Sequence, residues 1–244
     1  MSVSTVSVED QGFRWGLGVF ESLRVKKGVA LFHQMHLENI TEAADALGLP
    51  MPEVELWKKA PEGEGVWRWY LTPQAQLTSW EAGEPVLPES YSLSLSPFIV
   101  QRASWEARYK TLSYLLRYQA RKEVGTDEAV LLNENGVLAS ASMANLFWVK
   151  DGCLNTPSLE CGCREGVLRR WIEESWAGKF YEGAFFPADL LEADEVFVTN
   201  SRIGVMPIST YGGRILELGS VTKELQAQHQ ETVMRELGVK KKEL

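Results

Sequence analysis

The stretch DEAVLLNENGVLASASMANLFWVKDGCLNTP, residues 127–157, predicts β structure in the second half of the chain. It contains three apolar runs with the composition of strands, EAVLLN, VLAS and NLFWVKDGCLNTP. The Asn135-Gly136 dipeptide between the first two runs is a strong turn signal. We therefore expect successive strands joined by short turns in this part of the chain.

Helical and strand patterns mix irregularly through the rest of the sequence. Without a regular alternation of strand and helix, the pattern favours an α+β fold in two lobes, a small lobe at residues 1–88 and a larger one at 89–244. Helices are expected at residues 33–50, from just after Lys110 to about 124, at 164–178 and at 221–238. Strand-like patterns occur at residues 6–32, 67–72, 91–98 and 195–200, and a turn-rich segment at 73–90 is the candidate linker.

Composition excludes several classes of function. The 244 residues are 45% apolar, which is enough for a sizeable core, and no apolar stretch approaches the length of a membrane span. The net charge of −8, without a basic stripe, argues against a nucleic-acid partner. The N-terminus lacks the regions of a secretory signal, so we expect a cytoplasmic protein.

Three cysteines, Cys153, Cys161 and Cys163, lie close together in the sequence. A structural zinc site needs four ligands at characteristic spacing, and no histidine lies near these three. We therefore expect reduced thiols and no metal.

Lys110 stands in apolar company, with Tyr109 before it and the run TLSYLL after it. A solvated surface lysine is one interpretation. The other is an amine in a partly apolar pocket, where burial lowers the pKa of a lysine and makes it a nucleophile. The residues alone leave both interpretations open.

Several motifs follow one another in a specific order. GFRWGLGVFESLRV and HLENI lie in the first half, and Lys110, the 127–157 stretch, REGVLRRWI and LLEADEVFVTNSRIGVMPI lie in the second. Together they resemble the class IV aminotransferase family over nearly the whole chain. These are pyridoxal-phosphate (PLP) enzymes of fold type IV, and they include branched-chain aminotransferases, D-amino-acid aminotransferases and 4-amino-4-deoxychorismate lyases. The resemblance implies a small N-terminal α/β lobe and a larger C-terminal pseudo-barrel lobe.

The resemblance implies roles for individual residues. Lys110 matches the lysine that holds PLP as a Schiff base and then moves the Cα proton of the substrate. Tyr114, four residues on and expected on the same helical face, matches a tyrosine that contacts the phenolate oxygen of PLP, although plain packing is an equal alternative.

The phosphate of PLP has its own expected contacts. EGVLR matches the loop at a helix start whose backbone amides hold the phosphate, so the amides would come from Gly166, Val167 and Leu168. Ser201 matches a phosphate-binding hydroxyl.

Two positions depart from the family pattern. Most relatives read His-x-x-Arg where this chain reads HLENI, so Asn39 stands at the position of a phosphate-binding arginine. Arg202 and Arg164 are candidates to replace it. In GVLASASMANLF, Ser140 stands where most relatives have the glutamate that keeps the pyridine nitrogen protonated. Asn39 and Ser140 are the cofactor contacts expected at these positions.

The departures favour elimination over transamination. A serine can donate to a neutral pyridine nitrogen, and a neutral ring is a weaker electron sink. The specific expectation is a 4-amino-4-deoxychorismate lyase of folate biosynthesis, which releases pyruvate and 4-aminobenzoate. An amino-acid aminotransferase, for branched-chain or D-amino acids, is the nearest alternative, and a non-catalytic relative with poor cofactor affinity is another.

The substrate and the assembly are also matters of resemblance. The expected partner is a small amino-group substrate, and its carboxylate needs a cation. Arg14 and Arg102 are the candidates, although each also fits an ordinary surface arginine. The family implies a homodimer.

Overall fold

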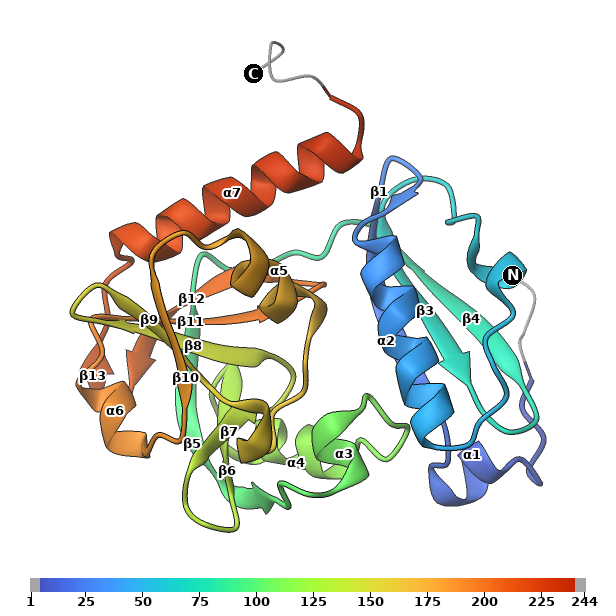
Figure 1. Ribbon diagram of the computed structural model, residues 1–244, viewed down its shortest axis with the longest axis horizontal. Helices are drawn as coiled ribbons and strands as arrows, with labels where there is room; N and C mark the ends of the chain where they lie inside the picture. Colours follow the sequence, from blue (N-terminus) through green and yellow to red (C-terminus); the bar gives the residue numbers. More distant parts are fainter. Residues whose placement is uncertain (1–4, 240–244) are drawn as a thin grey trace. The chain divides into compact units, whose positions relative to one another are not determined.

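The computed structural model describes residues 5–239, which form two compact units (Figure 1). Unit 1 contains the residues up to Val86, the segment Tyr109–Ser113 and the residues from Glu231 on. Unit 2 contains Leu87–Arg108 and Tyr114–Gln230. The division therefore differs from a single boundary after residue 88, because two later segments return to unit 1.

Unit 1 is built on a four-stranded antiparallel sheet in the order β2-β1-β3-β4, and α2 packs against β1. Its core centres on Trp57 and Trp69, whose rings stack with centroids 4.7 Å apart. In chain order the elements are α1 (Gln11–Trp15), β1 (Val19–Lys26), β2 (Val29–Ala30), α2 (His33–Ala46), the short helix η1 (Val54–Trp57), β3 (Gly65–Leu71) and β4 (Gln76–Ala82).

The expected helix at 33–50 and strand at 67–72 are confirmed by α2 and β3. The linker expected at 73–90 is wrong in part, because β4 pairs with β3 along its whole length. Within the strand pattern at 6–32 the chain forms the short helix α1. Asp10 accepts a hydrogen bond from the Gly12 amide at the start of α1, and Gly16 ends it in the left-handed conformation.

The segment Tyr109–Ser113 belongs to unit 1 because its backbone pairs with the chain at β1. The Phe20 amide donates to the Lys110 carbonyl at 2.9 Å, and the Leu112 amide donates to the Gly18 carbonyl at 2.9 Å. Gly18 permits this approach, since a Cβ atom there would lie 2.6 Å from Cδ1 of Leu112 and also 2.6 Å from the Leu71 carbonyl oxygen on β3.

The end of α7 (Ser220–Glu236) returns to unit 1 as well. The Glu236 carboxylate accepts a hydrogen bond from the Phe32 amide at 2.8 Å, just before α2 begins. Residues 231–236 therefore contact the small lobe, while the first part of α7 belongs to unit 2.

Unit 2 is built on a nine-stranded mixed sheet in the order β10-β9-β8-β11-β12-β5-β6-β7, with β13 paired to β12. The last strand, β7, contacts β8 and β9, so the sheet curls back on itself (Figure 1). The strands are β5 (Tyr91–Val100), β6 (Glu128–Asn133), β7 (Leu138–Ala141), β8 (Asn145–Lys150), β9 (Cys153–Pro157), β10 (Lys179–Gly183), β11 (Glu195–Asn200), β12 (Gly204–Tyr211) and β13 (Arg214–Ile215). The helices are α3 (Trp105–Arg108), α4 (Leu115–Glu123), η2 (Leu159–Cys161), α5 (Val167–Ser175), α6 (Pro187–Leu191) and the first part of α7.

The strands expected in the 127–157 stretch are confirmed by β6, β7, β8 and β9. The helix expected after Lys110 starts later than predicted, at Leu115, because the intervening segment pairs with unit 1. The helices expected near Gly166 and at 221–238 are confirmed by α5 and α7, and the strands expected at 91–98 and 195–200 by β5 and β11. Across residues 5–239, every helix is too short or too polar to traverse a lipid bilayer.

Candidate active site

Lys110 lies in a partly buried environment within unit 1. Its Nζ atom lies 4.7 Å from the centre of the Phe20 ring and 4.0 Å from Oε2 of Glu21, and its side chain is 16% exposed. Both partners are on β1, the strand with which the lysine segment pairs. An aromatic face and a carboxylate at this range stabilise a protonated amine. Lys110 is therefore not a solvated surface lysine.

Glu21 connects Lys110 to a buried histidine. Oε2 of Glu21 lies 2.7 Å from Nδ1 of His36 on α2, and both side chains are almost fully buried. Burial lowers the pKa of His36 below its ordinary value, while the hydrogen bond and charge of Glu21 act the other way. A neutral His36 with its hydrogen on Nδ1 donates that hydrogen to the Glu21 carboxylate.

The N-terminus of α5 in unit 2 is the candidate phosphate site. Gly166 is the residue before the helix, and the first amides of a helix have no partners within it. A Cβ atom at Gly166 would lie 2.1 Å from Oδ1 of Asn145, whose Nδ2 donates to the Arg164 carbonyl at 2.7 Å. The position therefore requires glycine. The side chains of Val167 and Leu168 are buried, which anchors the first turn.

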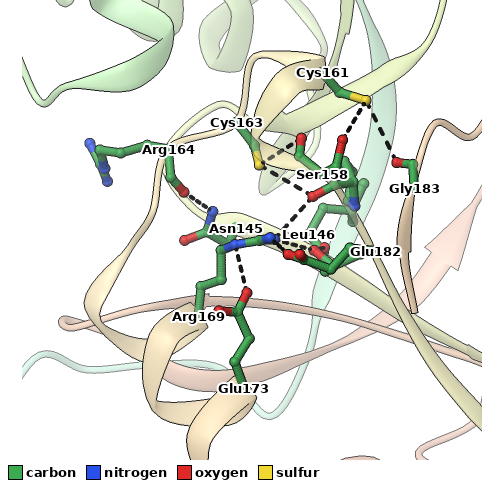
Figure 2. A network of polar contacts seen from close by, with 12 residues as sticks. Asn145, Leu146, Ser158, Cys161, Cys163, Arg164, Arg169, Glu173, Glu182 and Gly183 are labelled. Atoms are coloured by element: carbon green, nitrogen blue, oxygen red, sulfur yellow. Dashed lines mark hydrogen bonds and ion pairs between the residues drawn. The ribbon is translucent and has the colours of Figure 1, made fainter. Parts of the chain in front are cut away.

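An ion network around a buried arginine holds α5 against the sheet (Figure 2). Arg169 is 1% exposed, pairs with Glu173 at 3.0 Å and forms a second ion pair with Glu182 on β10. Its Nη1 donates to Thr156 Oγ1 at 2.9 Å and to the Pro157 carbonyl at 3.0 Å. The arginine thus ties the helix to β9 and β10 one turn beyond Gly166.

Ser140 lies on β7 and is 2% exposed. Its Oγ atom accepts a hydrogen bond of 3.1 Å from Nη1 of Arg117, a buried arginine on α4. The motif that identified Ser140 gave no sign of Arg117, because the two are 23 residues apart and meet only when α4 packs on the sheet.

Tyr114 does not share a helical face with Lys110, and that expectation is wrong. It is the residue before α4, and the chain from Lys110 to Tyr114 is not helical. Ser201 is half-buried in the turn after β11, where Asn200 accepts hydrogen bonds from the amides of Arg202 and Ile203. Asn39 is half-buried on α2.

The two candidates for the substrate carboxylate are both about half exposed and paired. Arg14 pairs with Glu9 at 3.2 Å and stacks on Trp15, and Arg102 lies 3.5 Å from Glu134. Their roles stay predictions.

The three cysteines are free thiols, and burial raises the pKa of Cys163 to about 11. Nowhere in residues 5–239 do three histidine, cysteine, aspartate or glutamate side chains gather in a group that could hold a metal ion.

The sequence-predicted residues fall into two groups. Lys110, Asn39 and Arg14 lie in unit 1, and Tyr114, Ser140, Ser201, Arg102 and the α5 N-terminus lie in unit 2. The structure adds Glu21 and His36 to the first group. Both lie in motifs of the sequence, GVFESLRV and HLENI, but their pairing depends on α2 packing against β1.

Known proteins resemble this chain over most of its length. A family model described as amino-transferase class IV matches residues 18–211. An aminodeoxychorismate lyase from Bacillus subtilis is 28% identical, over 96% of this chain and 93% of the relative. A branched-chain-amino-acid aminotransferase from Pseudomonas aeruginosa is 26% identical, over 91% of this chain and 86% of the relative.

The crystal structure of 4-amino-4-deoxychorismate lyase from Pseudomonas aeruginosa is similar, with a TM-score of 0.83 and 25% identity over 94% of this chain and 96% of that one. This likeness confirms the two-lobed fold type IV architecture. The chain belongs to the class IV aminotransferase family, and it is an enzyme.

Replacing Arg169 by methionine should lower the free energy of unfolding by about 1–3 kcal/mol, because the buried Thr156 hydroxyl and Pro157 carbonyl would lose their donor and Glu173 and Glu182 their cation. Urea unfolding measures the change. Glu174→Ala, at an exposed position of the same helix, is the control and should stay within about 0.5 kcal/mol of wild type. A loss below about 1 kcal/mol in the arginine variant would show that the network does not anchor α5.

Proposed function

We propose that this enzyme uses PLP bound covalently to Lys110, and that it is an aminodeoxychorismate lyase. The observation that carries the proposal is the partly buried Lys110 amine, held between Phe20 and Glu21 in a member of this family. Lys110 is largely shielded from water, and Glu21 lies where it would hold the ammonium form of the amine after it takes a proton.

The residues present fit the chemistry of PLP. Lys110 supplies the amine for the aldehyde, and the glycine-requiring turn at Gly166 leaves the first amides of α5 available for a phosphate. Two buried hydroxyls, Thr111 Oγ1 beside the lysine and Thr199 Oγ1 two residues before Ser201, have no hydrogen-bond partner in the described part of the chain. Unpaired buried hydroxyls of this kind suit a site that binds a polar group.

Other residues would complete the contacts. Ser201 and the amides of Val167 and Leu168 would hold the phosphate, Tyr114 the phenolate oxygen and Ser140 the pyridine nitrogen. When bound, PLP supplies an electron sink for charge that develops at the substrate Cα.

The residues around Lys110 provide for proton transfer. With PLP bound, Lys110 Nζ would be the base that takes the Cα proton of the substrate. Glu21 lies 4.0 Å from Nζ and would stabilise the resulting ammonium group, and Nδ1 of His36 hydrogen-bonds to Glu21. The Cα proton would therefore have a named atom, Nζ, to occupy.

Elimination is favoured over transamination by the environment of Ser140. A serine paired with an arginine offers only donors to a pyridine nitrogen, and an unprotonated ring supports a long-lived carbanion poorly. Two lyases, from Bacillus subtilis and Pseudomonas aeruginosa, are among the relatives of the chain. An aminotransferase is the second candidate, and the 26% identical branched-chain enzyme is the observation that favours it.

The lysine is tested by the visible absorption spectrum of the purified protein with added PLP. Wild type should show a band distinct from that of free PLP, and the band should shift when an amino substrate is added. Lys110→Ala should give the spectrum of free PLP. Lys26→Ala, at a partly exposed lysine of β1 that pairs with Glu84, should behave like wild type. A distinct band that persists in Lys110→Ala would contradict the assignment.

The reaction is tested by its products. A lyase should convert aminodeoxychorismate to pyruvate and 4-aminobenzoate in equal amounts without a second substrate. If the protein instead forms glutamate from 2-oxoglutarate and an amino acid, and releases no pyruvate from aminodeoxychorismate, the aminotransferase is the correct reading. Homodimer assembly and a cytoplasmic location stay predictions.

A further inference from the structure

Arg117 is a buried cation without an ion pair. It is 7% exposed, and no carboxylate of the described residues pairs with it. Its Nη1 donates to Ser140 Oγ at 3.1 Å, to the Ser142 carbonyl at 3.2 Å and to the Ala141 carbonyl at 3.3 Å. Burying an arginine costs free energy unless its N–H groups are hydrogen-bonded and its charge is paired. The position of Arg117 next to the end of β7 therefore requires an explanation.

The hydrogen bond from Arg117 fixes what Ser140 can offer to a ligand. A hydroxyl carries one hydrogen, and because Oγ accepts from Nη1, the Ser140 hydrogen is free to donate elsewhere. The structure shows no acceptor for it among the described residues. Ser140 and Arg117 together therefore form a pair that can donate to a group in the site.

The charges around Arg117 leave it a cation. Burial lowers its pKa, and Arg164 acts in the same direction, while Tyr114, Glu128 and Cys163 raise it. A guanidinium has so high an ordinary pKa that it keeps its proton at neutral pH. A fixed positive charge beside a weak base disfavours protonation of that base.

Glu128, whose charge acts on Arg117, already has its oxygens occupied. They accept hydrogen bonds from the Ser142 hydroxyl and from the amides of Ala129 and Met143. Burial raises the pKa of Glu128, although these hydrogen bonds act the other way. The carboxylate is thus engaged by an amide of its own strand, β6, and by the turn that follows β7.

We propose that Ser140 donates its hydroxyl hydrogen to the pyridine nitrogen of PLP and that Arg117, positioned behind it, keeps that nitrogen unprotonated. The inference rests on the proposed use of PLP and deepens it. A protonated ring nitrogen would face the Ser140 hydroxyl hydrogen and the positive charge of Arg117, both of which disfavour its proton. An unprotonated nitrogen would instead accept a hydrogen bond from the Ser140 hydroxyl. Ser140 would contact the cofactor, and Arg117 is a positioning residue that acts through it.

This arrangement would set the course of the reaction. An unprotonated ring withdraws electrons weakly, so charge at the substrate Cα must be discharged promptly by a departing group. Elimination provides such a group and transamination does not. Arg117 would therefore select the reaction without touching the substrate.

The test is the ¹⁵N resonance of PLP labelled at the pyridine nitrogen and bound to the full-length protein, compared with free PLP at both ends of its own titration. Wild type should give the unprotonated shift from pH 6 to pH 9. A bound cofactor with the protonated shift at pH 7 would overturn the proposal. Absence of bound PLP would instead overturn the proposed function, so the two failures are distinguishable.

Three variants locate the effect. Ser140→Glu, which supplies an acceptor, should move the resonance to the protonated position. Ser140→Ala should leave the nitrogen unprotonated but shift its resonance, because the hydrogen bond is lost while Arg117 remains. Glu128→Gln should not change the resonance. An unchanged resonance in Ser140→Ala, or a change in Glu128→Gln, would contradict the assignment.

Discussion

A short stretch of backbone pairing decides the surroundings of Lys110. The Phe20 amide donates to the Lys110 carbonyl, and two residues later the Leu112 amide donates to the Gly18 carbonyl. Because β1 carries both Phe20 and Glu21, the same pairing brings the amine to an aromatic ring and a buried carboxylate. Without these hydrogen bonds Lys110 would be an ordinary loop lysine, and the proposed chemistry would have no amine in the correct environment.

Arg169 and Arg117, two buried arginines of unit 2, have different electrostatic surroundings. Arg169 forms ion pairs with Glu173 and Glu182, so its charge is neutralised and it serves to hold α5 against the sheet. Arg117 donates to two carbonyl groups and the Ser140 hydroxyl, and among residues 5–239 no carboxylate forms an ion pair with it. A cation in ion pairs helps to hold the fold together, whereas a cation without an ion-pair partner creates a positive electrostatic potential at neighbouring groups.

The sequence was informative where a structural feature depends on neighbouring residues. The helix α5 and its Gly166 start were predicted because apolar spacing and the preceding glycine are local signals. The sequence patterns gave wrong predictions where pairing between distant segments of the chain determines the structure. The turn-rich 73–90 segment forms β4 because β3 offers it a partner edge, and the 110–114 stretch is not helical because it pairs with β1. Contacts such as that between Arg117 and Ser140 join distant parts of the chain, and no local pattern reveals them.

The covalent role of Lys110 is tested most directly by reduction and peptide mapping. Borohydride converts a carbon–nitrogen double bond between PLP and a lysine into a stable secondary amine, which mass spectrometry locates after proteolysis. The account predicts one phosphopyridoxyl group per chain, on the peptide that contains Lys110, and no specific label in Lys110→Ala. A label spread over exposed lysines, or concentrated on a lysine other than Lys110, would contradict it.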